Sequence, residues 1–188
     1  MKHLKNLALL FITAITAISC SDDDDNHAGN HEEELITTVT YTLTNTADSS
    51  DVVTLEFEDL DGEGGAAGTY DISGALRTSS TYTGAITLSN ATETPAEDIT
   101  AEIQAEKEEH EFFFTPSITG VVITKTDQDS NGNPVGLATS LTTGAAGTGS
   151  ITIVLKHEPT KPNDNTASGA GGSTDLQVTF TNVNVVAP

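Results

Sequence analysis

Two short stretches of the sequence place oxygen-bearing side chains at the spacing of a calcium-binding loop. The clearer one is "DQDSNGNP", in which Asp127, Asp129 and Asn131 occupy alternate positions before Gly132. EF-hand loops open in this way, because their oxygen ligands converge at a sharp glycine turn. The twelfth position should carry a bidentate glutamate but holds Ala138, so the loop is not an EF-hand. A calcium site here would need an acid from elsewhere in the fold.

A second acidic stretch, "DLDGEGG", carries Asp59 and Asp61, and Asp71 lies close by in the sequence. These carboxylates could form a calcium site in the same way. The alternative is that both stretches are tight turns, where Asp, Asn and Gly are favoured for their backbone conformations. No cofactor is required by the sequence, and calcium is the candidate if one binds.

The histidines suggest a different metal chemistry. His31, His110 and His157 are each followed by glutamate, and Glu106 and His110 would share a helical face if a helix extends that far. Converging imidazole and carboxylate groups bind transition metals. The spacing matches no known motif, however, since there is no H-E-x-x-H and no two of these three histidines lie within one turn or one hairpin. The alternative is that these residues are solvated ends of strands and of a helix, with His110 easing the helix dipole.

The sequence offers little support for catalysis. Its many serines and threonines lie in no G-x-S-x-G motif, which is the turn that exposes a hydrolase nucleophile. It contains neither a phosphate-binding glycine loop nor a basic track with interleaved aromatic residues. We therefore expect a protein that is not an enzyme, and a small hydrolase is the third alternative.

The N-terminus has the layout of a secretory signal. Lys2 and Lys5 form a short positive region, and an apolar run extends from Leu7 to Ile18. This run of about 12 residues is shorter than the roughly 20 that a membrane-spanning helix needs. We therefore expect residues 1–19 to be a signal peptide that is cleaved.

The residues "AISC" that end this segment resemble a lipobox. In lipoproteins with this pattern the cysteine thiol is diacylglycerylated, the chain is cut before the cysteine, and the new N-terminus is acylated. The resemblance assigns these roles to Cys20. Several acyl chains, at about 0.8 kcal/mol per buried CH₂, make a lasting membrane anchor. The alternative is a soluble secreted protein with one spare cysteine, which as the sole cysteine cannot form an internal disulfide.

Residues 20–34 read as an acidic, solvated tether. Seven acids fall within the fourteen residues that follow Cys20, and such a run repels itself and buries nothing. The segment is similar to the acidic export signal of Bacteroidetes-type surface lipoproteins. That resemblance implies an outer-membrane lipoprotein exposed at the cell surface, with a periplasm-facing one as the alternative.

Net charge narrows the range of partners. Cleavage removes two lysines and no acid, which leaves five cations, 28 acids and a net charge of −23. Nucleic acid is therefore excluded as a partner. A glycan or a protein at the cell surface remains a candidate partner, and the oligomeric state is left open.

Residues 35–188 predict a single, mainly β domain. Alternation of apolar and polar residues, which is typical of half-buried strands, recurs between turn clusters rich in Gly, Asn and Asp. We therefore expect an immunoglobulin-like or Greek-key β-sandwich of about eight strands. The predicted strands fall within residues 35–46, 51–59, 78–90, 110–114, 120–126, 136–142, 149–157 and 174–186. The predicted core comprises Val39, Tyr41, Leu43, Val53, Leu55, Phe57, Ile86, Leu88, Val122, Ile151, Ile153, Leu155, Val178 and Phe180.

One segment breaks the strand period and predicts a short helix over residues 95–109. Thr94, Pro95 and Glu97 have the spacing of a capping box with its favoured N1 proline. Ile99 and Ile103 would form a thin apolar stripe one turn apart, so we expect this helix to cover a rim of the sandwich. At least one of the three phenylalanines at 112–114 must then lie on the opposite face of its strand, either buried beneath the helix, which we expect, or exposed as a binding platform.

The segments "TYTGAITLSNATETPAEDITAEI" and "DSNGNPVGL" resemble a family of small, uncharacterised Bacteroidetes-type lipoproteins. Members are often labelled type 1 periplasmic binding fold superfamily, a name that implies two lobes of alternating strands and helices. One helix between runs of strands does not fit that fold, so no sugar-binding function follows from the name. We expect a membrane-anchored, exported, non-enzymatic binding or accessory module. The alternative is a lipoprotein that binds calcium or a transition metal.

Overall fold

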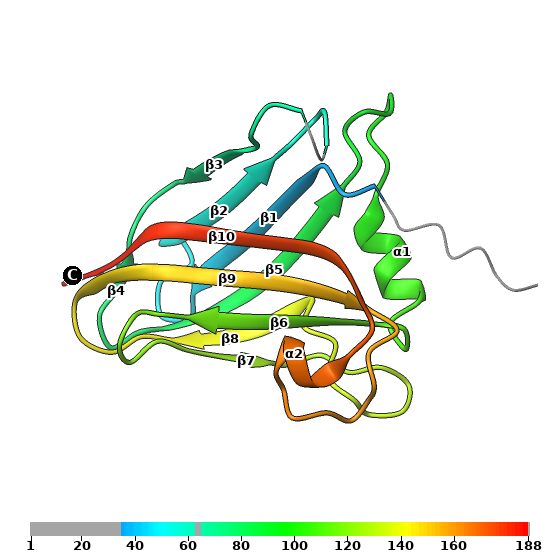
Figure 1. The fold of residues 1–188 in the computed structure, drawn as a ribbon. Helices are drawn as coiled ribbons and strands as arrows, with labels where there is room; N and C mark the ends of the chain where they lie inside the picture. Colours follow the sequence, from blue (N-terminus) through cyan, green and yellow to red (C-terminus); the bar gives the residue numbers. More distant parts are fainter. Residues whose placement is uncertain (1–34, 63–64, 188) are drawn as a thin grey trace, which may run out of the picture. The chain divides into compact units, whose positions relative to one another are not determined.

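A computed structural model of the chain describes residues 35–62 and 65–187. The predicted signal peptide, Cys20 and the predicted acidic tether lie outside these residues. The described part contains ten strands and two helices, arranged as two β-sheets that face each other (Figure 1). The predicted β-sandwich is therefore confirmed.

The first sheet has six strands in the order β3-β2-β1-β5-β8-β7. Strands β1 and β2 form a hairpin, and β5 pairs with the other side of β1. The arrangement β3-β2-β1-β5 is Greek-key-like, because three consecutive antiparallel strands are followed by one that returns beside the first. The strands are β1 (Thr38–Asn45), β2 (Val52–Glu58), β3 (Thr69–Ile72), β5 (Thr81–Ser89), β7 (Val122–Lys125) and β8 (Ala138–Thr142).

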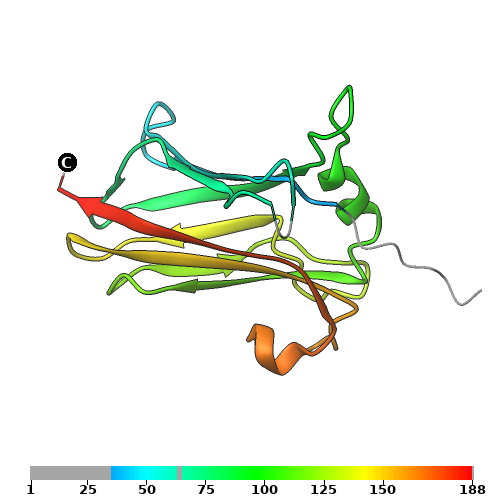
Figure 2. The same ribbon diagram turned by 45° about the horizontal axis from the view of Figure 1, so that its top comes forward.

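The second sheet has four strands in the order β4-β10-β9-β6. Strand β9 lies antiparallel between β6 and β10, and the two-residue β4 runs parallel to the end of β10. Turning the molecule shows the two sheets as separate layers (Figure 2). The strands are β4 (Leu76–Arg77), β6 (His110–Pro116), β9 (Gly147–His157) and β10 (Ser173–Val186).

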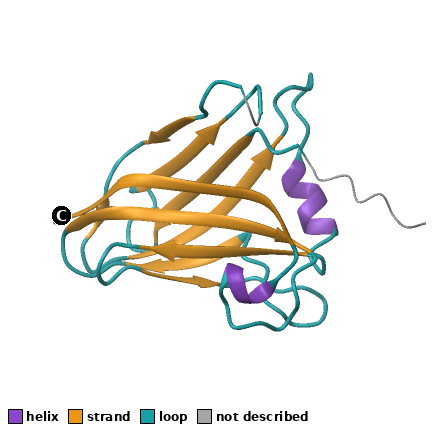
Figure 3. Cartoon of the chain, in the orientation of Figure 1, coloured by secondary structure: helices purple, strands orange, loops and turns teal. Residues whose placement is uncertain are grey.

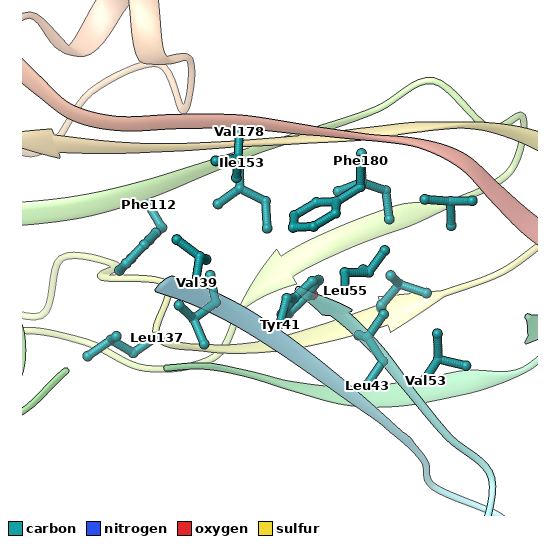
Figure 4. Close-up of a cluster of buried hydrophobic side chains, with 14 of the residues drawn as sticks. Val39, Tyr41, Leu43, Val53, Leu55, Phe112, Leu137, Ile153, Val178 and Phe180 are labelled. Carbon is teal, nitrogen blue, oxygen red and sulfur yellow. The ribbon is translucent and has the colours of Figure 1, made fainter. Parts of the chain in front are cut away.

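Alternation along the strands builds the core between the sheets. In β1, Val39, Tyr41 and Leu43 are fully buried, while the threonines between them are only partly buried. They meet side chains of the second sheet such as Ile153 and Phe180 (Figure 4). Burial raises the pKa of Tyr41 to about 12, and its hydroxyl is 2.7 Å from Thr139 Oγ1, so this buried polar group is satisfied.

Helix α1 (Ile99–Ala105) is shorter than the predicted helix over 95–109, and the predicted N-cap at Thr94 is wrong. Glu97 instead exchanges two backbone hydrogen bonds of 3.1 Å with Asn90, which holds residues 91–96 in a hairpin loop. The N-cap is Asp98, whose side chain accepts from the backbone N–H of Ala101 at 3.2 Å. The strand-like pairing of Asn90 with Glu97 therefore overrides the local capping pattern, and the spacing of the capping residues does not predict this pairing.

The predicted position of α1 is confirmed, because it covers one end of the sandwich (Figure 3). Its two isoleucines, Ile99 and Ile103, are buried in the core. Strand β8 pairs with β5 only from Thr81 to Ala85. Further along β5, Thr100 of the helix bonds the N–H and C=O of Leu88 at 2.8 and 3.1 Å. The helix therefore satisfies backbone groups that no strand covers.

Three elements escaped prediction, so the expected strand number of eight is corrected to ten. Strand β3 is exposed and carries little alternation, and β4 spans only two residues. Helix α2 (Ala167–Ala170) is a single turn in a segment that reads as a Gly-rich loop. Such short elements form because tertiary contacts hold them, and not because of local propensity.

Two of the predicted core residues are not fully buried. Val122, on edge strand β7, is 57% exposed, and Phe57 is only partly buried against the core. Phe113 is the phenylalanine that faces away from the core, where it forms a second buried cluster with Val154 and Ala170. Within the described residues, no helix is both long enough and apolar enough to cross a membrane.

Truncation of the core should separate buried from exposed positions. We expect Phe180→Ala to lower the free energy of unfolding by about 3–5 kcal/mol, because it removes a fully buried ring and leaves a cavity. Val122→Ala should change it by less than about 0.5 kcal/mol, since Val122 is exposed. Urea denaturation of both variants measures the difference, and equal effects would contradict this core.

Candidate functional site

The carboxylates of "DQDSNGNP" organise the loop between β7 and β8. Asp127 accepts backbone hydrogen bonds from Gly136 at 2.7 Å and from Leu137 at 2.9 Å, one with each oxygen. Asp129 accepts from the backbone N–H groups of Asn131 and Asn133 at 2.9 and 2.8 Å. Each predicted acid therefore already serves as an acceptor for its own loop.

The other predicted acidic pair behaves in the same way. Asp59 accepts from the backbone of Gly62 at 3.0 Å, and Asp61 accepts from the backbone of Ala66 at 2.9 Å. The hydrogen bonds from Ala66 and then from the side chain of Asp59 hold the pKa of Asp61 below its usual value. Within residues 35–62 and 65–187, neither pair joins a third imidazole or carboxylate within metal-binding reach. Calcium at these loops stays a prediction.

Lys161 connects Asp129 to the start of β6. Its Nζ donates to the backbone carbonyls of Lys107 and His110, both at 2.7 Å, and lies 3.4 Å from Asp129 Oδ2. Desolvation raises the pKa of Asp129, but hydrogen bonds from Asn133 and Asn131 and the charge of Lys161 outweigh it, so that this pKa lies below its usual value. The segment that carries Lys161 is thereby tied over the end of the second sheet.

Two histidines meet at this same end of the sandwich. His110 is the first residue of β6 and His157 is the last of β9, and the antiparallel register places them directly opposite each other. Their rings stack with centroids 4.7 Å apart and an interplanar angle of 17°. Both side chains are buried, with 0% and 6% of their surface exposed.

Asp175 approaches the histidines from the third strand. The register between β9 and β10 shifts between Thr174 and Leu176, which makes Asp175 the extra residue of a β-bulge. A bulge changes the direction in which a side chain points. Asp175 Oδ2 lies 3.8 Å from His110 Nε2, and its side chain is fully buried. The group contains three potential ligand atoms, one from each residue, that all lie within 4.8 Å of one another.

Glutamates surround the histidines on the solvent side. Glu109 Oε2 lies 3.8 Å from His157 Nε2, and the Glu109 side chain is 44% exposed. Glu109, His157 and Glu158 form a second group of close potential ligand atoms. Glu106 and His110 do not share a helical face, because α1 ends at Ala105. The backbone carbonyl of Glu106, and not its carboxylate, meets His110, at 3.1 Å from Nδ1.

No family model, curated protein or solved structure matches the chain. The function of this domain must therefore be argued from its own residues.

His110 and His157 are recognisable in the sequence as members of H-E pairs, but the sequence does not predict that their side chains are in contact. The two H-E pairs lie at the start of one predicted strand and the end of another, which is the only signal that they share an end of the sheet. Strands β6 and β9 pair in the tertiary structure although 47 positions separate His110 from His157 in the sequence. Asp175 comes near the histidines through a β-bulge in β10. Neither feature leaves a local sequence pattern.

A cavity of about 390 Å³, the outer cavity, lies beside the two edge strands β6 and β7 and the segment 161–165. In its lining, Glu111 forms an ion pair with Lys125 and accepts from Asn163 Nδ2 at 2.7 Å. Lys125 Nζ also lies 4.1 Å from the centre of the Phe113 ring, and burial lowers the pKa of Lys125. The cavity is lined by Glu111, Ile123, Thr124, Lys125, Asn133, Pro134, Lys161, Pro162, Asn163 and Asn165.

The structural role of Asp127 can be measured directly. We expect Asp127→Ala to cost about 1–3 kcal/mol in the free energy of unfolding, because the N–H groups of Gly136 and Leu137 lose their acceptor. Asp71→Ala, at an exposed position on β3, is the control and should cost less than about 0.5 kcal/mol. If calcium raises the melting temperature of the wild type but not of Asp127→Ala, this loop binds the ion after all.

The lowered pKa of Asp129 predicts a dependence of stability on pH. A carboxyl whose pKa is lower in the folded state stabilises the fold above the unfolded pKa of about 3.9, and this contribution is lost as the pH falls through the folded value. The stability difference between wild type and Asp129→Asn should therefore be largest near neutral pH and shrink below about pH 4. Chemical denaturation across this range tests the sign, and a difference that grows on acidification would contradict it.

Proposed function

We propose that the chain is an exported lipoprotein, anchored to the outer membrane through Cys20, whose β-sandwich is a non-enzymatic binding module at the cell surface. The lipobox-like residues before Cys20 and the acidic run after it support the anchor and the export. The proposed tether of residues 20–34 ends shortly before β1 begins at Thr38, so an acidic segment would separate the domain from its anchor. The outer cavity beside β6 and β7 is the observation that carries binding.

The chemistry of the cavity favours a neutral, hydroxyl-rich ligand. Its apolar surface comes from Ile123, Pro134 and Pro162. Its uncharged polar groups are three asparagine amides and the hydroxyl of Thr124, and its charged groups are Glu111, Lys125 and Lys161. A saccharide has a matching character, because its ring presents apolar C–H faces and its edge presents hydroxyls. A cavity of about 390 Å³ lies within the range of ordinary small-ligand sites. We therefore propose a glycan as the ligand.

The lysines near the outer cavity do not create an anion site. Lys125 is paired with Glu111, and Lys161 bonds two carbonyls and Asp129. Lys156 donates to the carbonyl of Gly172 and the hydroxyl of Thr174 at 2.9 and 2.8 Å. Each ammonium group already has partners in the protein, so a ligand need not supply a negative charge.

The anchor is tested by Cys20→Ser. We expect this variant to leave the membrane fraction and to lose incorporation of a labelled fatty acid, because the thiol is the proposed acceptor of the diacylglyceryl group. Ser21→Ala is the matched control and should remain lipidated in the membrane fraction. Membrane retention of Cys20→Ser, or an unmodified wild type by mass spectrometry, would contradict the anchor.

Ligand binding is tested with the full-length lipoprotein in detergent on an array of bacterial and host glycans. Asn165→Gly removes an amide from the cavity at a residue with φ of 61°, a conformation that glycine adopts freely. We expect the double variant Asn165→Gly/Thr124→Ala to bind glycan about 10-fold more weakly or worse, because it loses one or two hydrogen bonds to the ligand. Thr181→Ala, at an exposed position on β10, should bind as the wild type does. An array on which the wild type binds no glycan would overturn the proposal.

A further inference from the structure

We propose that His110, His157 and Asp175 bind one divalent transition-metal ion, with Zn²⁺ as the best match. Two imidazole nitrogens and a carboxylate are a ligand set that zinc accepts readily, and calcium and magnesium prefer oxygen ligands alone. This site is separate from the outer cavity and does not depend on the lipid anchor or on glycan binding. Its three ligands come from three adjacent strands of one sheet.

The ligand atoms are close enough for small movements to bring them to one ion. Ligand atoms about 2.0–2.1 Å from a tetrahedral zinc lie roughly 3.3 Å from one another. His110 Nε2 and Asp175 Oδ2 are 3.8 Å apart, and all three potential ligand atoms lie within 4.8 Å of one another. The near-parallel histidine rings must tilt toward each other to aim their nitrogens at one ion.

One ring nitrogen of His110 is held by the backbone. Its Nδ1 lies 3.1 Å from the carbonyl oxygen of Glu106, and because a carbonyl only accepts, Nδ1 is the donor of this hydrogen bond. Its Nε2 lies 3.8 Å from Asp175 Oδ2. Metal-binding histidines commonly use the other ring nitrogen in this way, because the second bond fixes the tautomer and the ring orientation.

The backbone around the ligands is firmly held. Lys161 donates to the carbonyl of His110, and the ladder between β6 and β9 continues from His110 to Pro116. On the far side, the bulge at Asp175 is followed by regular pairing from Leu176 to Phe180. Ligands on paired strands are positioned more rigidly than ligands on a loop.

Charge also favours a cation. The carboxylate of Asp175 is fully buried beside two buried imidazoles, and a divalent cation bound there would compensate its charge. Glu109 lies 3.8 Å from His157 Nε2 and belongs, with His157 and Glu158, to a separate group of close potential ligand atoms. The competing arrangement has two separate imidazolium–carboxylate pairs, His110 with Asp175 and His157 with Glu109. These two arrangements differ in whether the protein takes up a metal.

The test uses the full-length lipoprotein in detergent, freed of metal with a chelator and titrated with ZnCl₂ by calorimetry. We expect one Zn²⁺ per chain and a rise in melting temperature. His157→Gln and Asp175→Asn should each lower the association constant by more than the roughly 10- to 100-fold that loss of a second-shell partner causes. Asp71→Asn is the matched carboxylate control and should bind as the wild type does.

The acidic N-terminal segment needs its own control, because His27 and His31 lie beside seven acids. The double variant His27→Gln/His31→Gln should retain the same stoichiometry and affinity. If it loses zinc binding while His157→Gln retains it, the tether is the metal site and the proposal is wrong. Absence of 1:1 binding by the wild type with Zn²⁺, Cu²⁺, Ni²⁺ and Co²⁺ would also overturn it.

A measurement on the wild type guards against variants that fail to fold. Nitrogen-15 NMR of the histidine rings should show the Nε2 resonances of two histidines moving to metal-bound shifts in slow exchange as Zn²⁺ is added. Two imidazolium rings that do not respond to Zn²⁺ would establish the ion-pair arrangement instead.

Discussion

The register of β9 against its two neighbours is the constraint on which the rest of this structure depends. Because side chains alternate between faces, this register turns Ile151, Ile153 and Leu155 into the core. A slip of one residue would expose all of them, so hydrophobic burial selects one pairing strongly. The same pairing brings His157 opposite His110. The core and the histidine cluster therefore have a single physical cause.

Alternation also gives the second sheet two different faces. The residues of β6 and β9 that alternate with the core residues point outward. Among them, Phe113 and Val154 pack beneath the segment that carries α2 and Lys161. Lys161 joins this outer layer to the backbone of His110 on the inner side. Consecutive residues of β6 therefore face different surroundings, because His110 belongs to the buried cluster and Glu111 lines the outer cavity.

Much of the fold could be predicted from the sequence, because period-two patterns such as Val39, Tyr41 and Leu43 report directly on burial. Helix α1 was found through Ile99 and Ile103, but its start was misplaced, since the pairing of Asn90 with Glu97 overrides the capping pattern. The acids at the turns were recognised, and their local hydrogen bonds follow ordinary turn chemistry. The meeting of His110, His157 and Asp175 could not be predicted, because it needs strand order, register and a bulge together.

The most direct measurement is a crystal structure of the zinc-loaded protein with anomalous data collected at the zinc absorption edge. The register of β6, β9 and β10 predicts one strong anomalous peak about 2.0–2.2 Å from Nε2 of both His110 and His157 and from a carboxylate oxygen of Asp175. A peak located elsewhere, or a different pairing of β9 that separates the two histidines, would contradict the dependence of the site on this register.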